Sequence, residues 1–181
     1  RDFCLSRGLG DVYKRQVFCH ANTWAIIAEC MLGNNNEAYK IYKELIPHNI
    51  IKKFGVERYN AEPYIYSSNI RAPMAIDAGQ AGVSWLSGTA SWMMIALEEY
   101  IFGVKPCYNG LKLQPCIPDE WKKAVIKRRF RSCEYTIEID NSAACGNTVK
   151  EIYLDGKKFD GEYILSSAPT ASVKIIMGKK K

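Results

Sequence analysis

The sequence has little of what several classes of protein require. It holds only two histidines, and its seven cysteines are an odd number, widely scattered, with no CxxC pair. This pattern argues against a zinc site or a disulfide framework and favours reduced thiols in a cytoplasmic protein. No apolar run approaches the roughly 20 residues that span a bilayer, so we expect no membrane role.

The chain also lacks a strong excess of charge. Its 181 residues carry a formal net charge of +6. The densest basic run, between Lys122 and Arg131, alternates with apolar residues, which is typical of a strand with one solvated face rather than of a nucleic-acid patch. We therefore expect no nucleic-acid partner.

The N-terminal segment is unusual. Residues 6–16, SRGLGDVYKRQ, back-translate into the second-read adapter of transposase-based sequencing libraries. They lack the apolar core of a secretion signal. We interpret residues 1–16 as a non-native, adapter-derived segment and take the native sequence from Val17. Without the four basic and two acidic residues of this segment, the net charge falls from +6 to +4.

The first half of the chain has helical patterning. Apolar residues recur at three-to-four spacing over Thr23–Leu32 and Asn36–Ile46, separated by the breaker GNNN. A third helix is predicted to begin at Ser87 or Gly88 and to close at Gly103. It is apolar almost all round, so we expect deep burial.

A long connection separates the second and third predicted helices, and the patterning changes after the third. Residues 47–86 are too many for an ordinary loop, so we expect this connection to be functional, with part of it helical. After residue 106 short alternating segments predict strands, with turns at Asn109-Gly110 and Asp155-Gly156. The strand segments are LKLQP, AVIKRRFR, CEYTIEID, TVKEIYLD, EYILS and SVKIIM.

Two features could carry chemistry. Ser87, Gly88 and Thr89 stand where a helix is predicted to start, and free N–H groups with the helix dipole make such a place suitable for an anion such as phosphate. The same residues also suit an ordinary N-cap. His20 precedes an apolar helix and is either a packed, hydrogen-bonded side chain or a functional one.

Four segments decide between these alternatives by resemblance. VFCHANTW, AEPYIYSSN, SWLSGTASW and LQPCIPDEW resemble, in order, the C-terminal part of the inverting disaccharide phosphorylases, the cellobiose- and chitobiose-phosphorylase family (glycoside hydrolase family 94). The resemblance covers nearly everything from Val17 to about Ile139. It implies that His20, Ser87 and Gly88 bind inorganic phosphate, with serine in place of the usual threonine.

The resemblance also implies a reaction. Phosphate attacks the anomeric carbon of a β-linked glucose disaccharide or oligosaccharide with inversion, and gives an α-sugar 1-phosphate. A protonated His20 would offset the charge of the attacking phosphate. No metal or cofactor is implied, since phosphate is a co-substrate.

Sugar contacts are implied for the second segment. Glu62, Tyr64 and Ser68 stand where the family shapes its sugar site, although a salt bridge within the helical bundle would explain Glu62 equally well. The general acid of the family is an aspartate upstream of the FCH segment. Neither Asp77 nor Asp140 matches its motif, so we expect this chain to be inactive alone.

By the same resemblance the fold class is an α + β multi-domain fragment. Residues 17–105 are expected to be the last helices of an (α/α)6 barrel, and residues 106–181 a C-terminal antiparallel β-sandwich. Such a fragment should expose apolar surface. The full-length protein is expected to be a cytoplasmic homodimer. Alternatives are a β-1,2-glucan-processing relative, a non-catalytic carbohydrate-binding module, and a hydrolase of similar toroidal fold.

Overall fold

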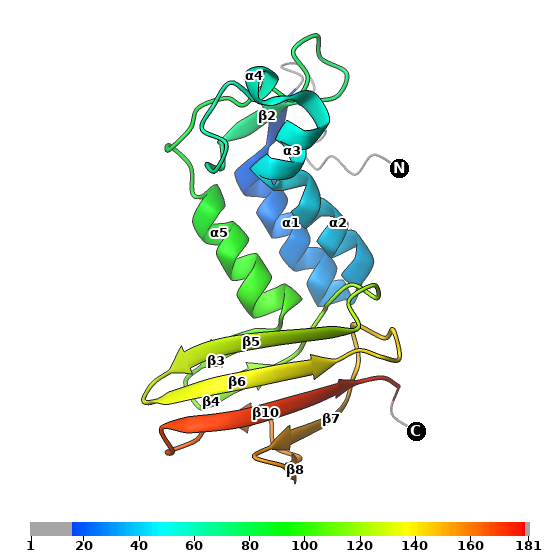
Figure 1. Ribbon diagram of the computed structural model, residues 1–181, viewed down its shortest axis with the longest axis vertical. Helices are drawn as coiled ribbons and strands as arrows, with labels where there is room; N and C mark the ends of the chain where they lie inside the picture. The colour runs from blue at the N-terminus through cyan, green and yellow to red at the C-terminus, as the bar shows by residue number, and fades with distance from the viewer. Residues whose placement is uncertain (1–15, 180–181) are drawn as a thin grey trace. The chain divides into compact units, whose positions relative to one another are not determined.

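The computed structural model describes residues 16–179, which form two compact units (Figure 1). The helical unit comprises the described chain up to Glu29 together with Glu37–Ala96. The sheet unit comprises Cys30–Asn36 and the chain from Leu97 onward. Residues 1–15 of the segment interpreted as adapter-derived lie outside the described residues. The origin of that segment and the domain boundary after residue 105 stay predictions.

The helices form where the apolar spacing predicts them. Both predicted helices are confirmed, and the first begins earlier than expected, at Cys19. The long connection contributes two further short helices. The four are α1 (Cys19–Leu32), α2 (Asn35–Leu45), α3 (Pro47–Phe54) and α4 (Val56–Tyr59). None of the helices in residues 16–179 is long and apolar enough to cross a membrane.

Side chains of the FCHANTW segment build the first turn of α1. Asn22 Nδ2 donates to the Phe18 carbonyl at 2.8 Å, and Thr23 Oγ1 donates to the His20 carbonyl at 2.6 Å. Both side chains are buried. These bonds explain why the helix begins before the apolar period does, and they fix the backbone on which His20 stands.

The third predicted helix has two parts. α5 (Thr89–Ile95) begins after an N-cap at Gly88, and the π-helix η2 (Ala96–Ile101) continues it. Gly103 follows with a positive φ of 66°, as predicted for a C-terminal glycine. A Cβ at Gly103 would lie 2.1 Å from the Gln114 carbonyl carbon, so only glycine allows this approach.

Deep burial of α5 is wrong for one of its faces. Thr89 and Met93 are buried, but Met94 is 61% exposed. Leu86, just before the helix, is 79% exposed, and Trp24 of α1 is 52% exposed. No described element of the helical unit covers these side chains, so the expectation of exposed apolar surface is confirmed.

The long connection is closed on itself by backbone pairing. β1 (Gln16–Phe18) pairs antiparallel with β2 (Asn69–Arg71), and Gly82 N donates to the Asn69 carbonyl at 2.8 Å. A Cβ at Gly82 would lie 2.1 Å from Asn69 Oδ1, so any larger residue there would displace the Asn69 side chain. The loops on both sides of β2 are therefore held in defined positions.

The sheet unit contains a three-stranded sheet, ordered β3-β4-β9, and a five-stranded sheet, ordered β5-β6-β10-β7-β8. Figure 1 shows the strands of the larger sheet side by side. All six predicted strands are confirmed, and β3 and β8 are additional. The strands are β3 (Val104–Cys107), β4 (Gly110–Leu113), β5 (Lys123–Phe130), β6 (Cys133–Asp140), β7 (Val149–Leu154), β8 (Lys157–Phe159), β9 (Tyr163–Ile164) and β10 (Thr170–Met177).

The expectation of purely antiparallel pairing is wrong at one ladder. β10 runs parallel to β6, with Val173 opposite Ile137, and antiparallel to β7. Alternation of apolar residues identifies a strand but not its direction, so the pattern could not reveal this pair. Ile137, Ile139, Val173 and Ile175 are almost wholly buried, so β6 and β10 supply the core of the sheet unit. The basic strand β5 alternates between exposed and half-buried residues, as its sequence predicts.

The IPDEW segment, Ile117 to Trp121, is hydrogen-bonded to the first residues of α2. Asn35 Nδ2 and Asn36 Nδ2 donate to the two carboxylate oxygens of Asp119, each at 2.8 Å. Gly146 N donates to the same carboxylate at 3.3 Å. These donors lower the pKa of Asp119, with the Asn36 amide as the main cause.

A buried asparagine organises the other side of that segment. Asn141 is fully buried, and its Nδ2 donates to the Trp121 carbonyl at 3.0 Å and to the Pro118 carbonyl at 3.4 Å. Its Oδ1 accepts from Cys145 N at 2.9 Å. We call Asn35, Asn36, Asp119 and Asn141 the amide node.

Candidate functional site

His20 and Gly88 are in direct contact in the helical unit, 68 positions apart in the sequence. A Cβ added to Gly88 would lie 3.0 Å from His20 Cε1 and 3.4 Å from its Nε2, so the imidazole lies against the glycine backbone. His20 Nε2 is buried and has no hydrogen-bond partner among the described residues. A buried nitrogen without a partner is costly, so its presence indicates a ligand site.

Hydroxyl groups stand next to this imidazole. Ser87 Oγ accepts from Thr89 N at 3.0 Å and shares a hydrogen bond with Thr89 Oγ1. Thr89 Oγ1 also donates to the Ser67 carbonyl at 3.4 Å. Ser87 therefore accepts from the first N–H of α5, one position before the N-cap residue Gly88, and it also stands beside the glycine that touches His20.

Aromatic side chains surround the imidazole. The His20 ring centroid lies 5.1 Å from that of Trp24 and 6.2 Å from that of Trp92, and the two indoles meet edge to face at 6.1 Å. Phe18 lies 6.3 Å from His20 on another side. Apolar rings reduce water around the imidazole and so strengthen any electrostatic interaction that it makes.

Glu62 meets Trp85 at the edge of this cluster. Trp85 Nε1 donates to Glu62 Oε1 at 2.8 Å, and this bond is the main cause that lowers the pKa of Glu62. Within residues 16–179 Glu62 thus bonds to an indole, and no cation of these residues forms a salt bridge with it. Trp85 is 68% exposed and adopts a positive φ of 66°, a strained conformation for a bulky residue. Such strain is concentrated at functional sites.

The other two candidate sugar contacts differ in their surroundings. Ser68 is half-buried, and its carbonyl accepts from Cys19 N at 2.9 Å, directly before His20. Its Oγ accepts from Asn69 Nδ2 at 3.2 Å. Tyr64 is 73% exposed and lies on the surface. The structure therefore brings His20, Ser87, Gly88 and Ser68 near one another and joins Glu62 to Trp85, whereas Tyr64 is not brought to the imidazole.

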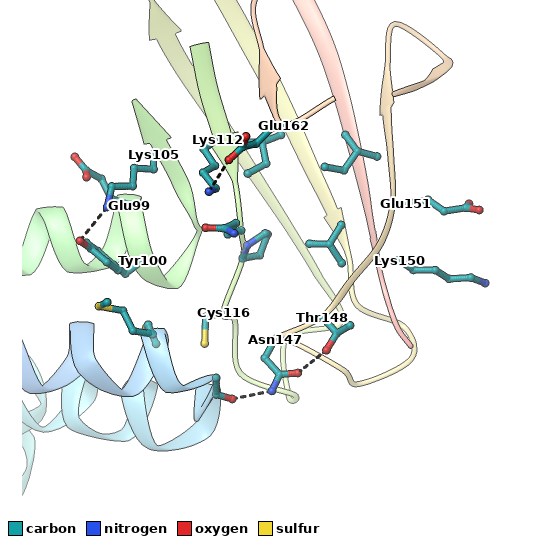
Figure 2. A pocket seen from close by; sticks show the side chains of 18 of the residues that line it. Glu99, Tyr100, Lys105, Lys112, Cys116, Asn147, Thr148, Lys150, Glu151 and Glu162 are labelled. Carbon is teal, nitrogen blue, oxygen red and sulfur yellow. Dashed lines mark hydrogen bonds and ion pairs between the residues drawn. The ribbon is translucent and has the colours of Figure 1, made fainter. Parts of the chain in front are cut away.

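A separate pocket lies in the sheet unit (Figure 2). Its volume is about 920 Å³, and none of the predicted site residues lines it. Lys112 Nζ pairs with Glu162 at 3.0 Å, and Lys105 Nζ donates to Tyr100 Oη at 3.1 Å. These two lysines are therefore already engaged within the sheet unit. Among residues 16–179 no group of three or more histidine, cysteine, aspartate or glutamate side chains could hold a metal ion.

The tryptophans are the main residues that sequence reasoning left without a role. Trp24, Trp85 and Trp92 all belong to the quoted segments, but no role was assigned to them. The contact of His20 with Gly88 was accessible only through the resemblance, because the spacing of two residues so far apart indicates nothing by itself.

This chain is similar in sequence to known proteins. The model of the glycosyl hydrolase 94 superfamily, catalytic domain, matches residues 12–103. The chain is 37% identical over 145 residues to an N,N'-diacetylchitobiose phosphorylase of Vibrio proteolyticus, covering 80% of this chain and 18% of that protein. It is 33% identical over 147 residues to a solabiose phosphorylase of Paenibacillus borealis, covering 80% and 19%.

A more distant similarity is to the cyclic β-(1,2)-glucan synthase NdvB of Rhizobium meliloti (strain 1021), at 26% identity over 136 residues, covering 75% of this chain and 5% of that protein. The chain spans about a fifth of the length of the phosphorylases that it matches. The family match covers half of the chain and includes every residue of the His20 cluster. The chain therefore belongs to the glycosyl hydrolase 94 superfamily.

Proposed function

We propose that the protein to which this chain belongs is a glycoside phosphorylase, which cleaves a β-linked disaccharide or oligosaccharide with inorganic phosphate and yields an α-sugar 1-phosphate. The observation that carries the proposal is the buried His20 Nε2, without a partner and packed against Gly88 beside the Ser87 hydroxyl. An oxyanion of phosphate would supply the missing hydrogen-bond partner.

In this reaction a phosphate oxygen attacks the anomeric carbon on the face opposite the glycosidic oxygen, and the bond to that oxygen breaks. Phosphate takes the place that an activated water has in inverting glycosidases. His20 would donate from Nε2 and, when protonated, offset negative charge, while Ser87 Oγ would donate a further hydrogen bond. The backbone at Gly88 would let phosphate approach closely, since no side chain intervenes.

The sugar would lie over the neighbouring loops. Glu62 and Ser68 would accept or donate hydrogen bonds to hydroxyl groups, and Tyr64 would present its ring from the surface. The carboxylic acid that protonates the leaving oxygen is assigned to an aspartate in another part of the full-length protein. This chain alone is therefore proposed to be inactive.

Disaccharides are the favoured substrate class because of the relatives. These relatives are named for solabiose, for N,N'-diacetylchitobiose and for a glucosyl-glucuronide. Phosphate is proposed as the co-substrate, without metal or cofactor. We further propose a cytoplasmic homodimer, in which residues 17–105 form the last helices of an (α/α)6 barrel and residues 106–181 a closing β-sandwich.

A second candidate is processing of β-1,2-glucan, which the similarity to a cyclic β-(1,2)-glucan synthase supports. This similarity is weaker than that to the phosphorylases, so we place it second. The two candidates differ in the glucan that the site accepts and in the product that is released.

The test is phosphorolysis of a β-linked disaccharide and β-1,2-glucan panel by the full-length protein, with and without phosphate. Release of sugar 1-phosphate is expected, and His20→Ala should reduce turnover about 10²–10³-fold, as loss of a charge-stabilising donor does. His48→Ala is the matched control, since the second histidine is exposed on α3. Sugar release without phosphate, or equal activity of the two variants, would refute the proposal.

A further inference from the structure

Two thiols line the pocket in the sheet unit. Cys30 stands in the last turn of α1, and Cys116 lies in the segment between β4 and β5. Both line the pocket of about 920 Å³, and Figure 2 shows Cys116 on its wall. Cys116 is 4% exposed, whereas Cys30 is half-buried. A reagent that enters the pocket therefore meets Cys30 first.

The two side chains interact with each other. The Cys30 side chain hydrogen-bonds the Cys116 thiol, and this bond lowers the pKa of Cys116 although burial opposes it. Cys19 provides the contrast within the same chain, because burial raises its pKa to about 12. A thiolate, not a thiol, is the attacking species in disulfide exchange. Cys116 is thus prepared for that role, and Cys19 is not.

The backbone around both thiols is fixed by hydrogen bonds within the sheet unit. Asn35 Nδ2 donates to the carbonyl of Ile117, the residue after Cys116, at 2.8 Å. Asn147 Nδ2 donates to the Gly33 carbonyl at 2.7 Å, one turn after Cys30. Cys116 N donates to the Ile101 carbonyl at 2.9 Å. The thiols are therefore held as neighbours by their surroundings and do not depend on a chance approach of mobile segments.

We propose that Cys30 and Cys116 are a site of reversible oxidation, at which a small-molecule disulfide such as glutathione disulfide introduces an intramolecular disulfide bond. The Cys30 thiolate attacks one sulfur of glutathione disulfide, so a mixed disulfide forms and one glutathione thiolate leaves. The Cys116 thiolate then attacks the Cys30 sulfur, and the second glutathione thiolate leaves. Two protein thiols are oxidised, one glutathione disulfide is reduced, and the two protons of the protein thiols end on the two glutathione thiolates that leave.

The bond would have a structural consequence. It would join the end of α1 to the segment that leads into IPDEW, and so close a loop between residues 30 and 116. A crosslink over so long a loop restricts the unfolded chain strongly. The oxidised form should therefore resist unfolding more than the reduced form, independently of any activity toward sugars.

The test uses the full-length protein, reduced and then incubated with glutathione disulfide, with free thiols trapped by alkylation before denaturation and peptide mapping. A Cys30–Cys116 linked peptide is expected, and dithiothreitol should remove it. In Cys116→Ser the resolving thiolate is absent, so a glutathione adduct should accumulate on Cys30. In Cys30→Ser, Cys116 should stay a free thiol. Cys107→Ser, which removes a half-buried cysteine outside this pair, should behave as wild type.

The mapping of the wild-type protein does not depend on whether a variant folds. If both wild-type thiols remain fully alkylatable after exposure to glutathione disulfide, the proposal fails. It also fails if Cys30 pairs with a cysteine other than Cys116. A folded Cys116→Ser variant without an adduct on Cys30 would overturn the proposed order of steps, and its circular dichroism spectrum establishes that it is folded.

Discussion

Polar side chains are treated differently in the two units of the molecule. Around His20 in the helical unit a buried imidazole nitrogen has no partner among the described residues, and a tryptophan at the edge of the cluster is strained. In the amide node of the sheet unit the polar atoms of Asn141 and Asp119 bond to backbone and amide groups. His20 of the first region and Asp119 of the second both belong to segments that resemble the phosphorylases.

This difference distinguishes two reasons why a segment can resemble its counterpart in related proteins: it can hold the fold together, or it can bind a ligand. A buried polar group costs free energy unless it is hydrogen-bonded, so satisfied groups need no ligand and serve the architecture. An unsatisfied group requires an explanation outside the folded chain. The His20 cluster is accordingly proposed as a place for a ligand, whereas Asp119 of the IPDEW segment holds the first residues of α2. Substitutions in the two regions should therefore change different measurable quantities.

The largest expected effect is on stability in the amide node. Asn141→Ala should lower the free energy of unfolding by about 2–4 kcal/mol, because it removes the buried hydrogen bonds to the Trp121 carbonyl and from the Cys145 N–H. Chemical denaturation measures this loss. Asn147→Ala is the matched control, since Asn147 is exposed, donates to the Gly33 carbonyl and accepts from the adjacent Thr148 hydroxyl, and its loss should cost about 1 kcal/mol or less. Equal losses would break the comparison.

A methyl group at Gly88 should raise the phosphate requirement of the enzyme rather than lower the stability of the fold. Its Cβ would lie 3.0 Å from His20 Cε1, so the imidazole has to move. Gly88→Ala should raise the phosphate concentration for half-maximal rate about 10- to 100-fold, equivalent to about 1.4–2.7 kcal/mol. Full-length enzyme kinetics measure it. In a His20→Ala background the same change should have little further effect, because Gly88 acts through His20. If the two effects add fully, the two residues act independently and this explanation fails.

Low pH should weaken the hydrogen bonds that the Asp119 carboxylate accepts. Since the folded-state pKa of Asp119 is lowered, its contribution is present above its unfolded pKa of about 4 and is lost as pH falls through the folded value. Asp119→Asn should cost about 1–2 kcal/mol at pH 7, and the difference from wild type should shrink toward pH 3. Denaturation at several pH values measures this. Asp140→Asn should cost less, because Asp140 bonds the adjacent Ser142; the opposite order would contradict the role of the node.

The smallest effect is expected at Ser87, which has both a structural and a proposed ligand role. Ser87→Ala should raise the phosphate requirement about three- to tenfold through loss of one hydrogen-bonding hydroxyl. Ser87→Thr keeps the hydroxyl and should change it less than about threefold. Steady-state kinetics of the full-length enzyme distinguish the two variants. If both variants match the wild type in phosphate requirement, the Ser87 hydroxyl serves only as the acceptor for the first N–H of α5.

Local patterns predicted most of the elements and their ends. Apolar spacing located α1 and α2, and alternation located six strands, because these signals depend on neighbouring residues. The turn at Asp155-Gly156 and the positive φ at Gly103 follow from the same local chemistry. The burial of α5 could not be predicted, since it depends on which other elements cover a helix that is apolar on every side.

Contacts between residues that are distant in the sequence could not be predicted. Asn141 bonds to residues 20 and 23 positions away, and Asp119 to residues 83 and 84 positions away, and neither spacing has a recognisable signature. The parallel ladder of β6 and β10 was missed for the same reason. For the candidate site, His20, Ser87 and Gly88 were identified through family segments, and their roles toward phosphate and sugar remain to be measured.

The position of β10 has a consequence for how the chain folds during synthesis. β10 stands between β6 and β7, so residues 170–177 complete the middle of the five-stranded sheet. Because synthesis proceeds from the N-terminus at about 5–20 residues per second, the β5–β6 and β7–β8 hairpins leave the ribosome before the strand that joins them. Until β10 joins them, β6 of the first hairpin and β7 of the second each have an open edge.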